Sequence, residues 1–245
     1  MDRKLALITG ASAGIGAAFA RIYAANGYDV ALTARRAERL ERLAEDIRLR
    51  HGVETLTVAA DLADPAAPGV ILDHLAAHGR GVDALVNNAG YGQPGTYADT
   101  TWDQQAAVLR VMLAAPSELA HRVLPGMADR RFGRIVNVAS LAGLIPGSAG
   151  HTLYGATKSY LVKFSQSLHL ENLATGVHVS ALCPGFTYSE FHDVNGTREQ
   201  IGASTPPWLW MGADEVAAPA TRPWRPTAPS PCRGRPTRPS PAWPS

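Results

Sequence analysis

The sequence predicts a single α/β domain built on one doubly wound parallel sheet, and three observations favour this fold class. Short apolar runs of strand length alternate with amphipathic stretches of helix length along most of the chain. The apolar runs are continuous rather than alternating, which is typical of strands covered on both faces. The stretches between them are long enough for the helical crossovers that parallel pairing requires. A length of 245 residues suits one such domain.

Six apolar runs rich in Val, Ile, Leu and Ala are expected to form the strands. They cover residues 4–9, 29–33, 54–59, 84–87, 134–139 and 178–183. Helices are expected at residues 15–26, 37–50, 65–78, 102–129 and 152–175. Asn26-Gly27 and Thr175-Gly176 are predicted helix stops, and Pro65 suits a first helical turn.

The composition changes near the C-terminus. After Val216 the chain has no Leu, Ile, Val or Phe, and this part contains half of its 18 prolines. Such a segment buries too little apolar surface to offset its ordering entropy. The preceding stretch GADEVAA begins like an amphipathic helix that is then cut off. We therefore expect a folded domain over residues 1–215 and a disordered Pro/Arg-rich tail over residues 216–245.

Charge and composition exclude several classes of function. The formal charge of +2 includes five arginines after residue 218, and the rest of the chain holds 18 basic and 21 acidic residues. That balance argues against a nucleic-acid-binding face. Two cysteines in different surroundings support neither a disulfide framework nor a metal site. Because no apolar run reaches the roughly 18 residues that span a bilayer and no signal-peptide pattern is present, we expect a cytoplasmic protein without membrane partners.

A glycine-rich turn joins the first strand to the first helix. The stretch LALITGASAGIGAAFA contains Gly10, Gly14 and Gly16. Glycines at such a turn let the backbone approach a pyrophosphate, which can rest on the amides and positive dipole of the helix N-terminus. The spacing differs from the commonest dinucleotide fingerprint, so a plain strand-to-helix turn stays an alternative. Its place after the first strand favours nucleotide binding.

Arginines follow the second strand. Ala34 stands where an acidic residue would bind the ribose of NAD, and Arg35 and Arg36 come next. A guanidinium suits a 2′-phosphate, so NADP(H) is favoured over NAD(H). The alternative is that these arginines only begin a solvated helix.

Polar and small residues end the fourth and fifth strands, in LVNNAG and NVASLAG. Ligands of open α/β sheets bind at the carboxyl ends of the strands, so Asn87, Asn88, Gly90 and Ser140 are expected beside the ligand crevice. Ordinary turn formation would also explain these residues.

The motifs occur together in an order that resembles one known family. They are Thr9, Gly10, Gly14, Ile15 and Gly16; Asn87, Asn88, Ala89 and Gly90; Ser140; Tyr154 and Lys158; and Pro184 and Gly185. Over residues 1 to about 215 the chain resembles the short-chain dehydrogenase/reductase (SDR) family. The resemblance implies a Rossmann-type fold and hydride transfer between NADP(H) and a carbonyl or alcohol. It also implies that the family's usual last helix and edge strand are lacking here.

The same resemblance implies the roles of individual residues. Tyr154 would be the acid/base, Ser140 would hold the substrate oxygen, and Lys158 would bind the nicotinamide ribose and lower the pKa of Tyr154. A free Tyr titrates near pH ~10, and an ammonium on the same helix face favours the phenolate. The cofactor-binding residues implied by the match are Gly10, Ser12, Gly14, Ile15, Gly16, Arg35, Asp61, Asn88, Ala89, Gly90, Tyr154, Lys158, Pro184, Gly185 and Thr187. No metal is implied.

One departure from the family's pattern concerns proton supply. The family normally has Asn after Val111, in a water-linked proton relay from Lys158, whereas this chain has Met112. A thioether cannot donate a hydrogen bond, so slow turnover is expected. The competing hypothesis is therefore a nucleotide-binding pseudoenzyme or a truncated, poorly active product.

A substrate lid is expected around residues 186–212. Its apolar strip at residues 208–211 suits a hydrophobic substrate, although core packing or a subunit interface would explain the strip equally well. The elements expected to be lacking often build a subunit interface in the family. We therefore expect a homodimer through the helices at 102–129 and 152–175 rather than a tetramer.

Overall fold

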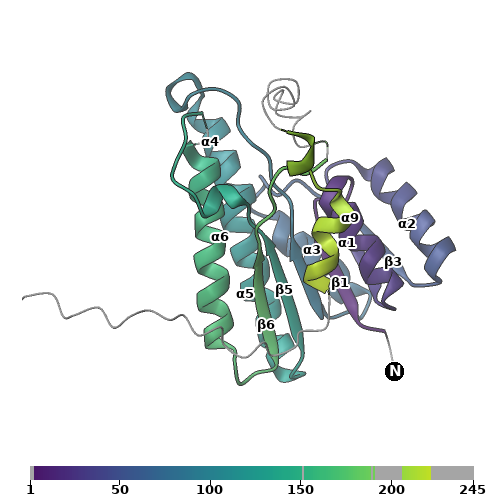
Figure 1. Cartoon of the computed structure of the whole chain (residues 1–245). Helices are drawn as coiled ribbons and strands as arrows, with labels where there is room; N and C mark the ends of the chain where they lie inside the picture. Colours follow the sequence, from purple (N-terminus) through teal and green to yellow (C-terminus); the bar gives the residue numbers. More distant parts are fainter. Residues whose placement is uncertain (1–2, 151, 189, 191–205, 222–245) are drawn as a thin grey trace, which may run out of the picture.

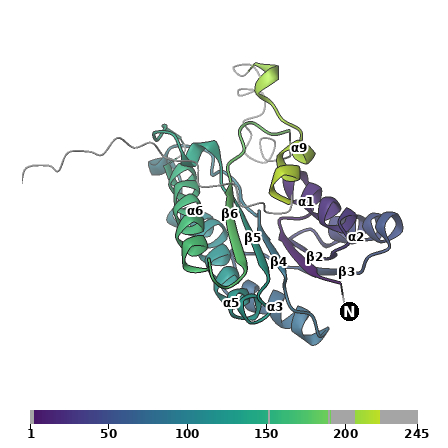
Figure 2. The same ribbon diagram turned by 60° about the horizontal axis from the view of Figure 1, so that its bottom comes forward.

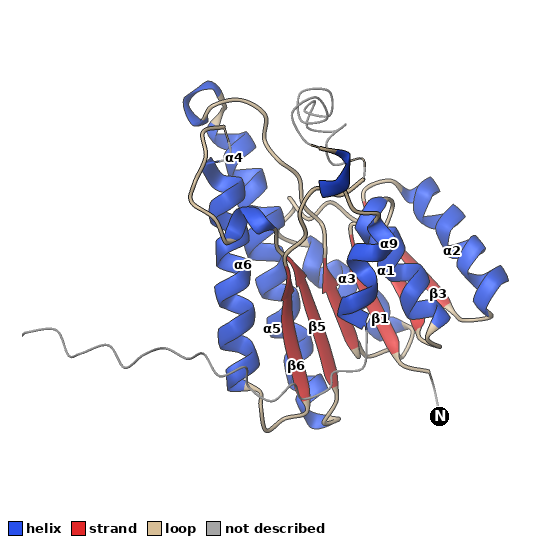
Figure 3. Cartoon of the chain, viewed as in Figure 1, coloured by secondary structure: helices blue, strands red, loops and turns tan. Residues whose placement is uncertain are grey.

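A six-stranded parallel sheet forms the centre of the molecule (Figures 1 and 3), in a computed structural model that describes residues 3–150, 152–188, 190 and 206–221. The strand order is β3-β2-β1-β4-β5-β6. The strands are β1 (Leu5–Thr9), β2 (Asp29–Ala34), β3 (Thr55–Ala59), β4 (Ala84–Asn87), β5 (Gly133–Val138) and β6 (Val177–Leu182). All six predicted strands are present, and the predicted doubly wound parallel sheet is confirmed.

The helices lie between the strands and after the last one. They are α1 (Gly14–Ala25), α2 (Ala37–His51), α3 (Ala67–Ala77), α4 (Trp102–Leu109), α5 (Ala115–Asp129), α6 (Thr152–Glu171) and α9 (Ala213–Ala217). The predicted helix at 102–129 contains a π-helical turn, Arg110–Ala114, between α4 and α5. Of the helices described, none is both long and apolar enough to cross a membrane.

Helices cover both faces of the sheet. Helices α1, α2 and α9 lie on one face and α3, α5 and α6 on the other (Figure 2). Successive residues of β1 enter the two cores in turn: Leu5 and Leu7 join the α3/α5 side, while Ala6 and Ile8 join the α1/α2 side. Because both faces are buried, each residue of the strand must be apolar, which explains the continuous apolar runs.

Two predicted helix boundaries are wrong. Helix α3 begins at Ala67 with Pro68 in its first turn, so Pro65 lies outside it. The Asp64 carboxylate accepts a hydrogen bond from the Ala66 N–H at 2.9 Å, which holds the preceding turn. Helix α6 ends at Glu171, before the predicted stop at Thr175-Gly176.

The C-terminal part of the described chain adds a short helix. Helix α9 packs against α1 and buries Val216 and Ala217, two residues that the sequence assigned to the disordered tail. Ordered structure continues to Thr221 in a 3-10 turn, so the predicted boundary at residue 215 falls too early. Residues 222–245 lie outside the described part, and the tail assigned to them stays a prediction. Among the described residues the sheet has no seventh strand.

A chain of buried hydrogen bonds connects the sheet to α6. The Asn87 Nδ2 at the end of β4 donates to Asn137 Oδ1 on β5 at 2.8 Å and to the Pro116 carbonyl on α5 at 3.2 Å. The Asn137 Nδ2 donates to Ser165 Oγ at 2.8 Å. The Ser165 hydroxyl in turn donates to the Leu161 carbonyl of α6 at 2.7 Å. These bonds fix α6 relative to the ends of the central strands.

Replacing Asn137 tests the contribution of this chain to stability. Asn137→Ala removes a fully buried amide and deprives Asn87 and Ser165 of one partner each. We expect the free energy of unfolding to fall by about 1–3 kcal/mol in chemical denaturation. Ser180→Ala, at an exposed position of β6, is the control and should stay within about 0.5 kcal/mol of the unmodified protein. Equal losses in both variants would contradict the assignment.

Candidate active site

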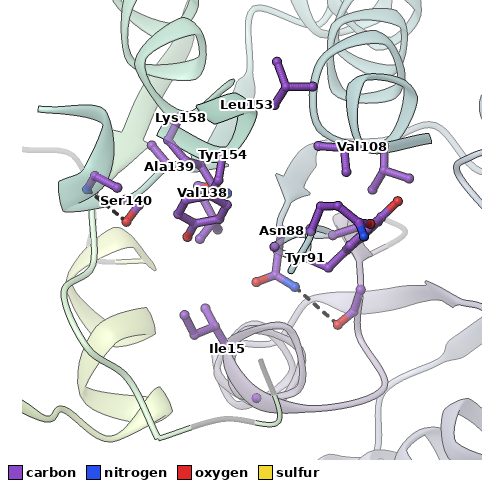
Figure 4. A pocket seen from close by; sticks show the side chains of 18 of the residues that line it. Ile15, Asn88, Tyr91, Val108, Val138, Ala139, Ser140, Leu153, Tyr154 and Lys158 are labelled. Atoms are coloured by element: carbon purple, nitrogen blue, oxygen red, sulfur yellow. Dashed lines mark hydrogen bonds between the residues drawn. The ribbon is translucent and has the colours of Figure 1, made fainter. Parts of the chain in front are cut away.

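A cavity of about 1330 Å³ opens at the carboxyl ends of the strands. Figure 4 shows Tyr154 and Lys158 on one wall and Asn88 and Tyr91 across from them. The predicted site residues that line the cavity are Gly10, Ser12, Gly14, Ile15, Arg35, Asp61, Asn88, Ala89, Gly90, Ser140, Tyr154, Lys158, Pro184, Gly185 and Thr187. One prediction of position does not hold, because Asn87 is buried in the hydrogen-bonded chain described above. Gly16 is not among the lining residues, and its part in cofactor binding stays a prediction.

The glycine turn is packed against the end of β4. Gly10 has a φ of +65°, and a Cβ there would lie 2.8 Å from Asn88 Nδ2. A Cβ on Gly16 would lie 2.3 Å from the Gly10 carbonyl oxygen, so the third glycine lets α1 approach the turn. The Asn88 amide donates to the carbonyls of Thr9 and Gly10, and the Thr9 hydroxyl accepts from the N–H groups of Asn88 and Ala89. This network holds the turn in place.

The N-terminus of α1 is open toward the cavity. Its N-cap residue, Ala13, has no side chain that can accept a hydrogen bond, and no acidic residue stands in the first turn. The first N–H groups of a helix lack partners within it and carry partial positive charge. Gly14 and Ile15, at the start of this helix, line the cavity. The end of α1 is therefore suited to an anion such as a pyrophosphate.

Ser140 and Tyr154 meet at the end of β5. The strand ends of β5 and β6 are joined by a hydrogen bond from the Ala139 N–H to the Leu182 carbonyl at 2.7 Å. The Ser140 Oγ accepts from the Ala142 N–H at 3.1 Å. Ser140 after β5 and Tyr154 on α6 both line the cavity, so the serine hydroxyl and the phenol belong to the same wall.

Burial sets the protonation of both catalytic candidates on α6. Burial raises the pKa of Tyr154, and the hydrogen bond from Ser140 partly offsets this effect. Lys158 is 5% exposed, and burial lowers its pKa to about 8. Its Nζ donates to the Val138 carbonyl at 2.7 Å and lies 5.6 Å from the Tyr154 ring centroid. Burial therefore raises the pKa of Tyr154 overall, and the lowering by Lys158 that the family resemblance implies stays a prediction.

A close contact holds α6 against the loop after β5. A Cβ on Gly143 would lie 2.6 Å from the carbonyl carbon of Lys158, so only glycine allows this approach. The Ser159 hydroxyl donates to the Gly143 carbonyl at 2.9 Å. The loop that carries Ser140 and the helix that carries Lys158 are thus directly joined.

Met112 lies beside the buried lysine. It is 2% exposed and belongs to the π-helical turn between α4 and α5. A Cβ on Gly90 would lie 3.6 Å from Met112 Cγ and 3.7 Å from Lys158 Nζ, so both side chains approach the same point. The side chains of Met112 and Lys158 therefore both border Gly90.

An ion-pair cluster lies where the cavity meets the end of β2. The Arg36 Nη2 donates to Ser12 Oγ at 3.1 Å and to Glu190 Oε2 at 2.9 Å, and Arg39 pairs with the other oxygen of Glu190. The sequence pointed to Arg35, which also lines the cavity. It missed Arg39 and Glu190 as site residues. The three-residue spacing of Arg36, the N-cap of α2, and Arg39 in its first turn was a usable signal, whereas nothing local pointed to Glu190.

The ends of the predicted lid are joined. Thr187 and Met211 form an isolated parallel bridge, with the Tyr188 N–H donating to the Met211 carbonyl at 3.0 Å. The Trp210 ring lies 5.5 Å from that of Phe186 and 5.0 Å from that of Tyr188. Phe186 and Leu209 line the cavity. Residues 191–205, within the predicted lid, lie outside the described part of the chain.

Comparison with known proteins agrees with this geometry. The short chain dehydrogenase family model matches residues 4–200. The NADP-dependent 3-hydroxy acid dehydrogenase YdfG of Salmonella typhi is 36% identical, over 81% of this chain and 79% of that protein. A short-chain dehydrogenase from Sphingobium yanoikuyae, solved in complex with NADPH, superposes with a TM-score of 0.79 at 34% identity, covering 88% of this chain and 82% of that one.

This chain is also similar to a second solved structure, that of an alcohol dehydrogenase. The bulky-bulky ketone specific alcohol dehydrogenase of Comamonas testosteroni has a TM-score of 0.76 at 30% identity, covering 89% of this chain and 81% of that one. Fold, strand-end motifs and comparisons agree. The chain belongs to the short chain dehydrogenase family, a family of oxidoreductases.

Proposed function

We propose that the protein transfers a hydride between NADP(H) and an apolar carbonyl or alcohol, with Tyr154 as the acid/base. The observation that carries this proposal is that Ser140, Tyr154 and Lys158 line the same cavity as the open end of α1. The Tyr154 hydroxyl supplies a proton donor for a substrate oxygen. The open N-terminus of α1 supplies a site for the pyrophosphate of a dinucleotide.

The residues present fit a dinucleotide cofactor. The open N-terminus of α1 suits the pyrophosphate, and Arg35, Arg36 and Ser12 suit a 2′-phosphate near the end of β2. Lys158 and Asn88, deeper in the cavity, are assigned to the nicotinamide half. When bound, the nicotinamide ring supplies or accepts the hydride. The NADP named for one relative and the NADPH bound in another support this choice.

Side chains of the protein supply the proton that the substrate oxygen gains on reduction. In the direction of reduction, the Tyr154 hydroxyl donates its proton to the substrate oxygen as that oxygen gains negative charge. Burial keeps the phenol protonated near neutral pH, and Ser140 orients it. Lys158, with its pKa near 8, is placed to return a proton toward Tyr154 after each turnover. Met112 offers no hydrogen-bonded route from Lys158 to solvent.

Apolar side chains in part of the cavity wall suit an apolar substrate. They come from α4, α6 and the loop after β6, and are Val108, Leu153, Phe186 and Leu209. Such a wall favours a carbonyl or alcohol with a sizeable hydrocarbon part. The relative named for bulky-bulky ketones is consistent with this substrate class.

The remaining expectations stay part of the proposal. They are a cytoplasmic location and a homodimer through the helices at 102–129 and 152–175. The alternative, a nucleotide-binding protein without turnover, draws no support from the relatives reported above, whose names are those of dehydrogenases.

Replacing Tyr154 separates the enzyme from a protein that only binds nucleotide. Tyr154→Phe keeps the ring but removes the proton donor, so carbonyl-dependent oxidation of NADPH should fall about 10²- to 10⁴-fold. The measurement is the absorbance of the reduced cofactor across a panel of ketones and aldehydes. Tyr160→Phe, on the same helix with its hydroxyl bonded to Ser117, is the control and should keep its rate. Equal rates in both variants would refute the role of Tyr154.

Replacing Arg35 tests the cofactor preference. Arg35→Ala should weaken NADPH binding by about tenfold or more while changing NADH binding little, because only NADPH carries the 2′-phosphate. Dissociation constants from calorimetry or fluorescence titration provide the measurement. Arg42→Ala, an exposed arginine of α2, is the control for a general loss of positive charge. Equal losses for the two cofactors would contradict the assignment.

Introducing the family's amide tests the proton relay. Met112→Asn places a hydrogen-bonding group next to Gly90, which Lys158 also borders, so the steady-state rate should rise by at least about twofold, a small part of a typical general acid–base effect. Met112→Leu, an apolar residue of similar size, should leave the rate unchanged. A rate in Met112→Asn that matches that of Met112→Leu would show that Met112 does not limit proton supply.

A further inference from the structure

The carboxylate of Glu190 lies against the arginines at the end of β2. Glu190 follows Thr187 in the loop after β6 and is separated from Arg36 by 154 positions in the sequence. One carboxylate oxygen pairs with Arg36 and the other with Arg39. The two pairs hold the loop after β6 to the start of α2.

This carboxylate sits among the groups that suit a 2′-phosphate. Arg36 donates both to Glu190 and to Ser12 of the glycine turn, and all three residues line the cavity. Adenosine ribose binds between the glycine turn and the end of the second strand in sheets of this type. An anion held by two arginines beside Ser12 therefore occupies the place of the cofactor's extra phosphate.

We propose that Glu190 is a cofactor-specificity residue that competes with the 2′-phosphate of NADP(H) for Arg36 and Arg39. This inference rests on the proposed function, since it assumes that a dinucleotide enters the cavity. NADP(H) must displace the carboxylate before its phosphate contacts the arginines. NAD(H) has only a hydroxyl at this position and leaves the ion pairs in place.

The ion pairs are of a kind that a phosphate can replace. The side chains of Arg36, Arg39 and Glu190 are each 40–45% exposed, so solvent screens their attraction. Arg39 and then Arg36 lower the pKa of Glu190, which keeps it charged at neutral pH. A phosphate monoester brings up to two negative charges and three acceptor oxygens, more than one carboxylate offers.

A purely structural role for Glu190 predicts the opposite effect. If the carboxylate only holds Arg36 and Arg39 in position, its loss lets both side chains move and weakens NADPH binding. Competition predicts that the same loss strengthens NADPH binding. The sign of the change therefore distinguishes the two roles.

The test compares Glu190→Gln with the unmodified protein in NADPH and NADH titrations. Glutamine keeps the size of the side chain and removes its charge. We expect the dissociation constant for NADPH to fall by about threefold or more, since two exposed ion pairs are lost as competitors, while the NADH constant changes less than about twofold. Glu38→Gln, an acid in the first turn of α2, is the matched control for removing one charge nearby.

Two further binding measurements show whether the 2′-phosphate and the two arginines cause the change in affinity. Adenosine 2′,5′-bisphosphate should gain affinity in Glu190→Gln, and adenosine 5′-monophosphate should not. The gain should vanish when Arg36 and Arg39 are both replaced by Ala. Weaker NADPH binding by Glu190→Gln, or an equal gain in NADPH affinity by Glu38→Gln, would overturn this inference but leave the proposed function standing. Failure of the unmodified protein to bind either NADPH or NADH overturns the proposed function itself.

Discussion

The arrangement of the site depends on one chain of buried hydrogen bonds, from Asn87 through Asn137 to Ser165. At 3.6 residues per turn, Ser165 lies on the same face of α6 as Tyr154 and Lys158. Anchoring Ser165 to the strand therefore also sets the rotation of the helix about its axis, and that rotation turns both catalytic candidates toward the cavity. Burial of the amides makes the chain specific, because any other rotation would leave polar groups without partners in the core.

Most of the fold could be predicted because the burial pattern was simple. Both faces of the sheet are covered, so the strands are continuously apolar and their positions followed from the sequence. Asn88, Gly90 and Ser140 followed from the rule that ligands bind at strand ends, whereas most other site residues followed from the family resemblance. Asn87 was misplaced because it is still part of β4, opposite Asn137, and the pleat directs it into the helix layer. Its neighbour Asn88, one residue later, lines the cavity.

Features that depend on distant contacts could not be predicted. The pairing of Glu190 with Arg36 and Arg39 depends on the path of a loop more than 150 residues further along the chain. The pKa of Tyr154 depends on burial by side chains from several elements. Composition placed the end of the folded domain too early, because α9 contacts α1 while burying only two residues, Val216 and Ala217. The average composition of a Pro- and Arg-rich segment does not reveal a contact made by so few apolar residues.

The joined ends of the loop after β6 have a consequence for how this protein can diversify. Thr187 and Met211 meet in a bridge, and the Phe186, Tyr188 and Trp210 rings pack around it. Two stretches of chain that lie far apart in the sequence are thus held side by side. Because the bridge fixes both ends, a change in the number of residues between Thr187 and Met211 costs little loop-closure entropy. Insertions and deletions between these two positions should therefore leave the strands that carry the cavity unchanged.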